Sequence, residues 1–215
     1  MLLNKNAKLV MIGDSITDAG RTQPVGEGLF DALGRGYVSL VDALLGAVCP
    51  EIGVRVVNMG TSGHTVRDLD TRWQTDVLDL KPDWLSVMIG TNDVWRQFDS
   101  PKQPEIHVLP EEYERTLNAL ITRTLPAVPN IVLMTPFYLE PNRADPMRRR
   151  MDEYGRVVKQ IAEKHGALFV DTQAAFDKVL TAYYPATIAW DRVHPSQTGH
   201  MVLARAFLEA VEFQW

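Results

Sequence analysis

Residues 8–17 read KLVMIGDSIT, an apolar run that ends in glycine, aspartate and serine. The first six residues are apolar almost throughout, which is typical of a strand covered on both faces of a parallel sheet. Four further short apolar runs have the same character. They lie at residues 54–59, 84–90, 130–135 and 168–171.

The segments between these runs carry apolar residues at helical spacing of three and four. Pro110 followed by Glu111 and Glu112 is a good helix start, because proline suits the first turn and acidic side chains suit the helix N-terminus. Alternating strands and helices indicate an α/β fold around a parallel sheet, and we expect one domain spanning residues 1–215. The predicted helices cover residues 37–48, 110–124, 147–165 and about 196–211.

The composition argues against several classes of partner. The net charge is −5, and the only basic cluster is Arg148 to Arg150, which we interpret as a solvated helix face, so no nucleic-acid surface is expected. No apolar run approaches the ~20 residues of a membrane span, which predicts no membrane partner. The apolar stretch at residues 9–12 is too short for a signal peptide, which predicts a cytoplasmic protein.

Polar residues follow the first three predicted strands, and a further polar segment lies near the C-terminus. In open α/β sheets ligands bind beyond the carboxyl ends of the strands, so chemistry is expected there. Together these segments supply a hydroxyl, backbone donors beside glycine, a side-chain amide, and an acid with an imidazole, which are the groups that acyl transfer requires. The segments are GDSIT at 13–17, NMGTSG at 58–63, GTND at 90–93 and DRVHP at 191–195.

Ser15 is the candidate nucleophile, because it stands where the first strand gives way to the next segment. The alternative is an ordinary serine that caps a helix N-terminus. Asp14 must point away from Ser15, and we interpret it as holding the turn through hydrogen bonds to backbone N–H groups.

His194 is the candidate base, since a neutral imidazole can take the serine proton near neutral pH. Among five histidines it alone has an acid three residues earlier, Asp191, which can bind one ring nitrogen while the other faces the serine. A structural turn of the same pattern is the alternative. Of the others, His64 could line the site, His200 is expected to have a surface or capping role, and His107 and His165 lie in polar contexts.

Fixed donors must also stand where negative charge forms on the acyl oxygen. Three are available by position: the backbone N–H groups of Ser15 and Gly63, and the side-chain amide of Asn92. A plain turn glycine and an Asx turn are the alternatives for Gly63 and Asn92.

The four ordered segments resemble the sequence blocks of SGNH, or GDSL-type, hydrolases over the whole chain. The resemblance carries the family's serine, glycine, asparagine and histidine to Ser15, Gly63, Asn92 and His194, with Asp191 completing a triad. It implies a three-layer α/β/α flavodoxin-like fold with a five-stranded parallel sheet of order 2-1-3-4-5. It also implies catalysis without a metal or other cofactor. The family often has leucine where this chain has isoleucine at position 16, an apolar exchange that leaves the chemistry unchanged.

Within that family, four stretches are similar to bacilli-type acetyl xylan esterases. This closer resemblance implies a small-molecule partner, an acetylated xylo-oligosaccharide or related acetylated sugar, from which acetyl groups are removed. As substrate-binding residues we select Asp14, His64, Trp95, Tyr184 and Trp190; core packing is the alternative for the aromatic rings, and the favoured one for Phe137. The stretches are 88–97, 134–138, 145–149 and 189–195.

Three rival interpretations stay open. The first is a lipid esterase, lysophospholipase or thioesterase of the same fold, and the second is a carbohydrate-binding module without catalysis. The third is a metal-dependent hydrolase using Asp14, Asp93 and Asp191. Separately, Phe213 and Trp215 place large rings at the chain end, which predicts a homo-oligomer.

Overall fold

Five parallel strands form one sheet in the order β2-β1-β3-β4-β5 in the computed structural model, which describes residues 1–215. This confirms the predicted fold class and strand order. Three strands end one or two residues earlier than predicted, and after two of them a helix begins within three residues. The strands are β1 (Lys8–Gly13), β2 (Arg55–Gly60), β3 (Trp84–Met88), β4 (Asn130–Met134) and β5 (Leu168–Val170).

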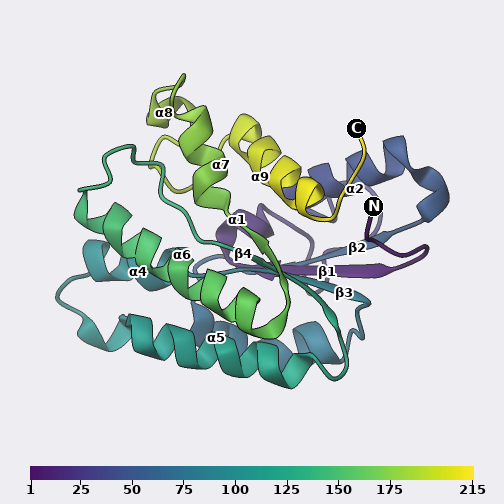
Figure 1. The fold of residues 1–215 in the computed structure, drawn as a ribbon, viewed down its shortest axis with the longest axis horizontal. Helices are drawn as coiled ribbons and strands as arrows, with labels where there is room; N and C mark the ends of the chain where they lie inside the picture. Colours follow the sequence, from purple (N-terminus) through teal and green to yellow (C-terminus); the bar gives the residue numbers. More distant parts are fainter.

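Helices cover both faces of the sheet. Figure 1 shows α2 and α9 above the sheet and α5 and α6 below it, which gives the three layers. The helices are α1 (Ser15–Asp18), α2 (Tyr37–Val48), α3 (Val66–Trp73), α4 (Thr91–Asp99), α5 (Pro110–Thr124), α6 (Pro146–His165), α7 (Thr172–Val179), α8 (Pro185–Ile188) and α9 (Gln197–Ala210). Three further short helical turns are η1 (Pro50–Ile52), η2 (Gln74–Leu78) and η3 (Pro104–Ile106). No helix combines the length and apolarity needed to cross a membrane.

The predicted helices at 37–48 and 110–124 are confirmed with both bounds. The third helix begins one residue earlier than predicted, and the fourth is one residue shorter at each end. Three helices, α3, α4 and α7, were not predicted from the sequence, and they have eight or nine residues each. Segments this short carry only two turns of apolar pattern, and packing rather than propensity stabilises them.

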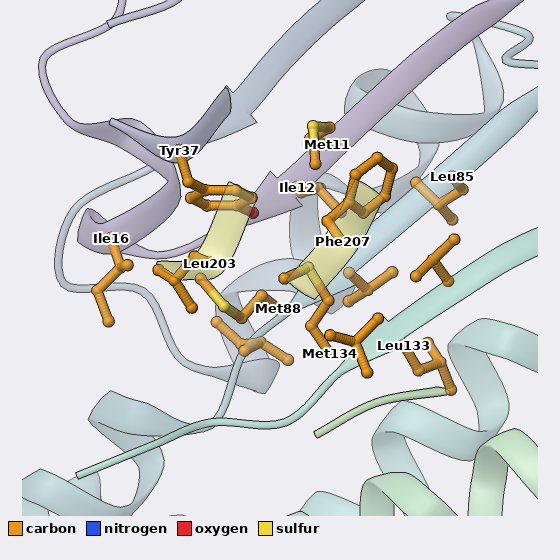
Figure 2. Close-up of a cluster of buried hydrophobic side chains, with 14 of the residues drawn as sticks. Met11, Ile12, Ile16, Tyr37, Leu85, Met88, Leu133, Met134, Leu203 and Phe207 are labelled. Carbon is orange, nitrogen blue, oxygen red and sulfur yellow. The ribbon is translucent and has the colours of Figure 1, made fainter. Parts of the chain in front are cut away.

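The core lies between the sheet and its helices. Figure 2 shows Met88 of β3 and Met134 of β4 in one buried cluster with Leu203 and Phe207 of α9. All four side chains are at most 2% exposed. The first two lie at the carboxyl ends of their strands, so the same packing fixes the edge of the sheet on which the polar segments lie.

Arg148 corrects the interpretation of the arginine cluster as a solvated helix face. Its side chain is 2% exposed and pairs with Asp152 at 2.8 Å and with Asp177 at 2.7 Å. The guanidinium also donates to the backbone oxygen of Glu140. Buried charges need such partners, so this arginine fastens the segment between β4 and α6. Of the three arginines, Arg149 is exposed and Arg150 is half-buried.

Close packing at Gly60 brings α1 against the end of β2. A Cβ at this position would lie 2.1 Å from the backbone nitrogen of Asp18, so only glycine fits. Asn58, two residues earlier, donates its side-chain amide to the backbone oxygens of Thr17 (2.7 Å) and Leu33 (2.8 Å). These contacts hold α1, which begins at Ser15, in a fixed place at the sheet edge.

Candidate active site

Ser15 is the first residue of α1, directly after β1. The N-cap of this helix is Asp14, whose carboxylate accepts a hydrogen bond from the backbone N–H of Ile16 at 3.0 Å. The serine hydroxyl is therefore not used as a cap, and Asp14 holds the turn. Gly13 allows the end of β1 to lie close to the end of β3, because a Cβ at position 13 would lie 2.4 Å from the backbone oxygen of Met88.

A chain of hydrogen bonds connects Ser15, His194 and Asp191. The serine Oγ lies 2.9 Å from Nε2 of His194, and Nδ1 of His194 lies 2.6 Å from Oδ2 of Asp191. An ionised carboxylate only accepts, so Nδ1 carries the proton and Nε2 is free to accept from the serine hydroxyl. The arrangement can deliver the serine proton to the imidazole.

Asp191 is oriented by the turn in which it lies. Its Oδ1 accepts from the backbone N–H groups of Val193 (3.0 Å) and His194 (2.8 Å), which leaves Oδ2 for the ring. Partial burial acts to raise the pKa of Asp191, but the hydrogen bonds from His194 and the backbone outweigh it, and the net pKa is lowered. The carboxylate therefore stays ionised beside the imidazole.

The turn itself is held by the segment after β4. Arg192 has a φ of +65°, a conformation that costs free energy in a residue other than glycine. The backbone N–H of Leu139 donates to the oxygen of Arg192 at 2.9 Å, and the Arg192 guanidinium pairs with Glu140. These long-range contacts were not visible in the sequence, because no local pattern connects the two segments.

The segment after β2 lies beside Ser15. The N–H of Thr61 donates to the oxygen of Gly13 at 3.0 Å, and the Asp18 carboxylate accepts from the Ser62 hydroxyl at 2.7 Å. Gly63 has a φ of +83° and open space around its Cβ position, so its conformation, not crowding, requires glycine. The Asn92 side-chain amide donates to the backbone oxygen of His64 at 3.0 Å, which brings the second and third segments together.

Two carboxyl groups lie buried beneath this site. Asp14 is 1% exposed and Asp93 is 0% exposed. Burial raises the pKa of Asp14 to about 6 and that of Asp93 to about 7. One oxygen of Asp93 accepts from the N–H of Val66 at 3.0 Å, at the start of α3, while the other has no hydrogen-bond partner.

The pKa of Asp93 predicts a pH-dependent effect of Asp93→Asn on stability. Between the ordinary pKa of 3.8 and about 7, the folded state keeps a proton that the unfolded state has lost. The contribution of Asp93 to the free energy of unfolding is therefore largest at low pH, and it falls as the pH rises. Since asparagine does not ionise, the free energy of unfolding of the variant relative to wild type should increase from pH 4 to pH 8, by on the order of 1 kcal/mol per pH unit at most.

Urea unfolding of both proteins across this range measures the difference directly. Subtracting the wild-type curve removes the effect of other groups, including His200, whose pKa burial lowers to about 4. Parallel curves would contradict the assignment of a raised pKa to Asp93.

The five residues selected for substrate binding differ in exposure and in position relative to the triad. Trp190 is 82% exposed and Tyr184 is 69% exposed, so neither packs in the core. The ring of Trp95 lies 5.7 Å from that of His194, between centroids, and His64 is half-buried beside the site. Asp14 lies beneath the surface, so its carboxylate cannot contact a bound sugar.

His200 and Phe137 stabilise the fold and lie outside the triad. Nδ1 of His200 accepts from the N–H of Tyr37 at the start of α2, a capping contact. Phe137 is fully buried, as favoured from the sequence. No group of three or more His, Cys, Asp or Glu side chains is arranged to hold a metal ion.

Comparison with known proteins identifies the family. The model of the GDSL-like lipase/acylhydrolase family matches residues 11–202. The chain belongs to this family. The membership predicted from the four sequence segments is therefore confirmed.

Two relatives are similar over almost their entire length. An acetylxylan esterase of Geobacillus stearothermophilus is 62% identical, with 100% of this chain and 98% of the relative covered. The crystal structure of that enzyme, Axe2, matches with a TM-score of 0.99. LAE5, an alpha/beta hydrolase from the metagenome of Lake Arreo, Spain, is 56% identical, covers 99% of this chain and 98% of its own, and has a TM-score of 0.97.

Structures have been solved for three Axe2 variants with substitutions at positions 15, 191 and 194. S15A, D191A and H194A are each described as a catalytic mutant of that enzyme. This chain has Ser15, Asp191 and His194 at these numbers.

Proposed function

We propose that this protein is a serine esterase that removes acetyl groups from acetylated xylo-oligosaccharides or related acetylated sugars. The observation that carries the proposal is the hydrogen-bonded chain from Ser15 Oγ through His194 to Asp191. In this family of acylhydrolases such a chain is suited to activate a hydroxyl for attack on an ester carbonyl.

The reaction proceeds in two halves. Ser15 Oγ attacks the acetyl carbonyl while His194 Nε2 takes its proton, and the imidazolium then protonates the sugar ester oxygen as its bond to the acetyl carbon breaks, which releases the sugar hydroxyl. The product is an acetyl-enzyme. A water molecule, deprotonated by His194, attacks the acetyl group, and return of the proton to Ser15 releases acetate. Asp191 fixes the ring tautomer and stabilises the imidazolium in both halves.

Negative charge on the acyl oxygen is stabilised by donors at the mouth of the site. We assign these to the backbone N–H groups of Ser15 and Gly63 and to Nδ2 of Asn92. Two observations support the assignment: α1 holds Ser15 at the sheet edge, and the hydrogen bond from Asn92 reaches the residue directly after Gly63.

The substrate class is supported by the acetylxylan esterase relative and by exposed aromatic rings on the segment that precedes Asp191. Trp190 and Tyr184 present flat faces to solvent, which suits stacking on pyranose rings. None of the five principal cavities borders Ser15 or His194. The hydroxyl–imidazole pair lies at the surface, with 43% of the His194 side chain exposed, and no principal cavity beside it would receive a long acyl chain. This favours a sugar acetylesterase over the lipid esterase, lysophospholipase and thioesterase alternatives.

We expect a strong preference for the acetyl group in a series of nitrophenyl esters. Since none of the five principal cavities lies beside Ser15 to receive additional methylene groups, kcat/KM should fall by at least about tenfold from acetyl to butyryl. Acetate release from acetylated xylo-oligosaccharides, followed in parallel, tests the sugar class. Comparable turnover of acetyl and butyryl esters would instead favour the lipid-directed alternatives.

We also propose that the chain forms a homo-oligomer, although the exposed residues that support this differ in part from the Phe213 and Trp215 named from the sequence. Phe213 is 4% exposed and packs against Trp215, so only the latter ring is available at the chain end. Leu29 and Phe30 are also exposed, and a homo-oligomer would cover such side chains. Sedimentation equilibrium tests this proposal. Cell fractionation tests the proposed cytoplasmic location.

A further inference from the structure

The charged side chain of Arg96 lies beside the oxygen of the Asn92 carboxamide. Nη2 of Arg96 lies 3.3 Å from Oδ1 of Asn92, and the amide nitrogen donates to the backbone oxygen of His64. A carbonyl oxygen can only accept and a guanidinium can only donate. Rotating the carboxamide by half a turn would therefore set like groups against each other at both ends.

Arg96 is itself held in place. It lies one turn after Asn92 on α4, and its Nη1 pairs with Asp99 three residues further on. Its guanidinium also lies 5.2 Å from the centroid of the Trp95 ring, a cation–π contact. Only 31% of the side chain is exposed. The planar fork of arginine can serve Asn92 and Asp99 at once, which the single nitrogen of lysine cannot do as well.

These contacts affect the hydrogen bonds available to a reacting ester. Nδ2 of Asn92 has two hydrogens, and one is used by His64. The other remains for the acyl oxygen only while the carboxamide keeps its orientation. Positive charge at Oδ1 also polarises the amide and strengthens donation from Nδ2.

We propose that Arg96 is a positioning residue for stabilisation of the acyl oxygen, holding the Asn92 carboxamide with Nδ2 directed at the reacting group. This role rests on the esterase function proposed above. It adds to the site a residue whose side chain forms no hydrogen bond with Ser15 or His194.

A double-mutant cycle on nitrophenyl acetate tests the proposal, using Arg96→Met, Asn92→Ala and the combination. Methionine retains an unbranched apolar chain over Trp95 but cannot donate. We expect Asn92→Ala to lower kcat about a hundredfold, and Arg96→Met about tenfold with KM within about twofold. The double variant should be no slower than Asn92→Ala, because Arg96 acts through the missing amide.

Other outcomes would overturn the proposal. Multiplying losses in the double variant would show that Arg96 acts independently of Asn92. A displaced acid limb of the pH–rate profile in Arg96→Met would show that it acts on His194 through Trp95. Arg96→Lys should recover part of the rate, and Arg150→Met, which removes a comparable pair with Glu153 on α6, is the matched control for loss of a surface ion pair.

A measurement without turnover separates this proposal from the proposed function. The side-chain amide of Asn92 gives two proton resonances in a ¹⁵N-correlated spectrum, and their separation reports the environment of each hydrogen. In Arg96→Met the pair should move toward the positions of exposed asparagines while the melting temperature stays close to that of Arg150→Met. Unchanged resonances would overturn the positioning role. Absent ester turnover in the wild type would overturn the esterase function and with it the role toward the acyl oxygen, but not the orientation of the Asn92 carboxamide by Arg96.

Discussion

Replacement of Ser15 by alanine should lower kcat for nitrophenyl acetate by at least about 10⁴-fold. The substitution removes the only oxygen hydrogen-bonded to Nε2 of His194, so no nucleophile remains for the imidazole to activate. Folding should be preserved, because Asp14 rather than Ser15 caps α1 and alanine is a good residue at a first helical position. Initial rates with pure protein measure the loss.

Ser39→Ala is the matched control, since this serine on α2 donates to the oxygen of Gly36 far from the triad in sequence and contact. Near-wild-type turnover by Ser15→Ala would refute the assignment of the nucleophile. Acetate release from acetylated xylo-oligosaccharides should disappear in the same variant. If the wild type hydrolyses nitrophenyl acetate alone, Ser15 stands as nucleophile and another acylated substrate must be sought.

Asp191→Asn should reduce kcat by about 10⁴-fold, although it changes only one atom of the side chain. Oδ1 of Asp191 accepts from the N–H groups of Val193 and His194, and the amide oxygen of asparagine should keep this place. The amide nitrogen then faces Nδ1 of His194, where Oδ2 had been. A donor there favours the tautomer with its proton on Nε2, which cannot accept from Ser15.

Steady-state kinetics and a structure of the variant test this expectation together. Asp171→Asn is a suitable control, because this aspartate caps α7 through the N–H of Ala174 and does not contact the triad. If the kcat of Asp191→Asn stayed within tenfold of the wild-type value, a group other than this carboxylate would set the tautomer of His194.

Several elements of the site followed from the sequence because they lie at the ends of buried apolar runs. Ser15 and Asn92 each follow such a run by only a few residues, and parallel strands bring their carboxyl ends to one edge. The pair of Asp191 and His194 was recognisable because three residues of a turn suffice to bring the two side chains together.

Other elements depend on contacts between distant segments. Arg148 appeared to belong to a solvated face, yet it is buried because Asp177, from another helix, neutralises it. Arg96 carried only the weak signal of lying four residues after Asn92, and the exposure of Trp190 could not be read from its neighbours. Helical spacing gives the direction of a side chain relative to its own helix, but not the charge or cover that another element supplies.

The sequence by itself determined the α/β class, the strand order through its family resemblance, and the residue types available for acyl transfer. These follow from local periodicity and from polar residues placed after buried strands. Only the tertiary structure decided which hydroxyl meets which imidazole, that Asp14 is buried, and that Arg192 is held by Glu140. Hydrogen bonds and burial depend on distances of a few ångströms between segments up to 179 residues apart, and such distances exist only once the core has packed.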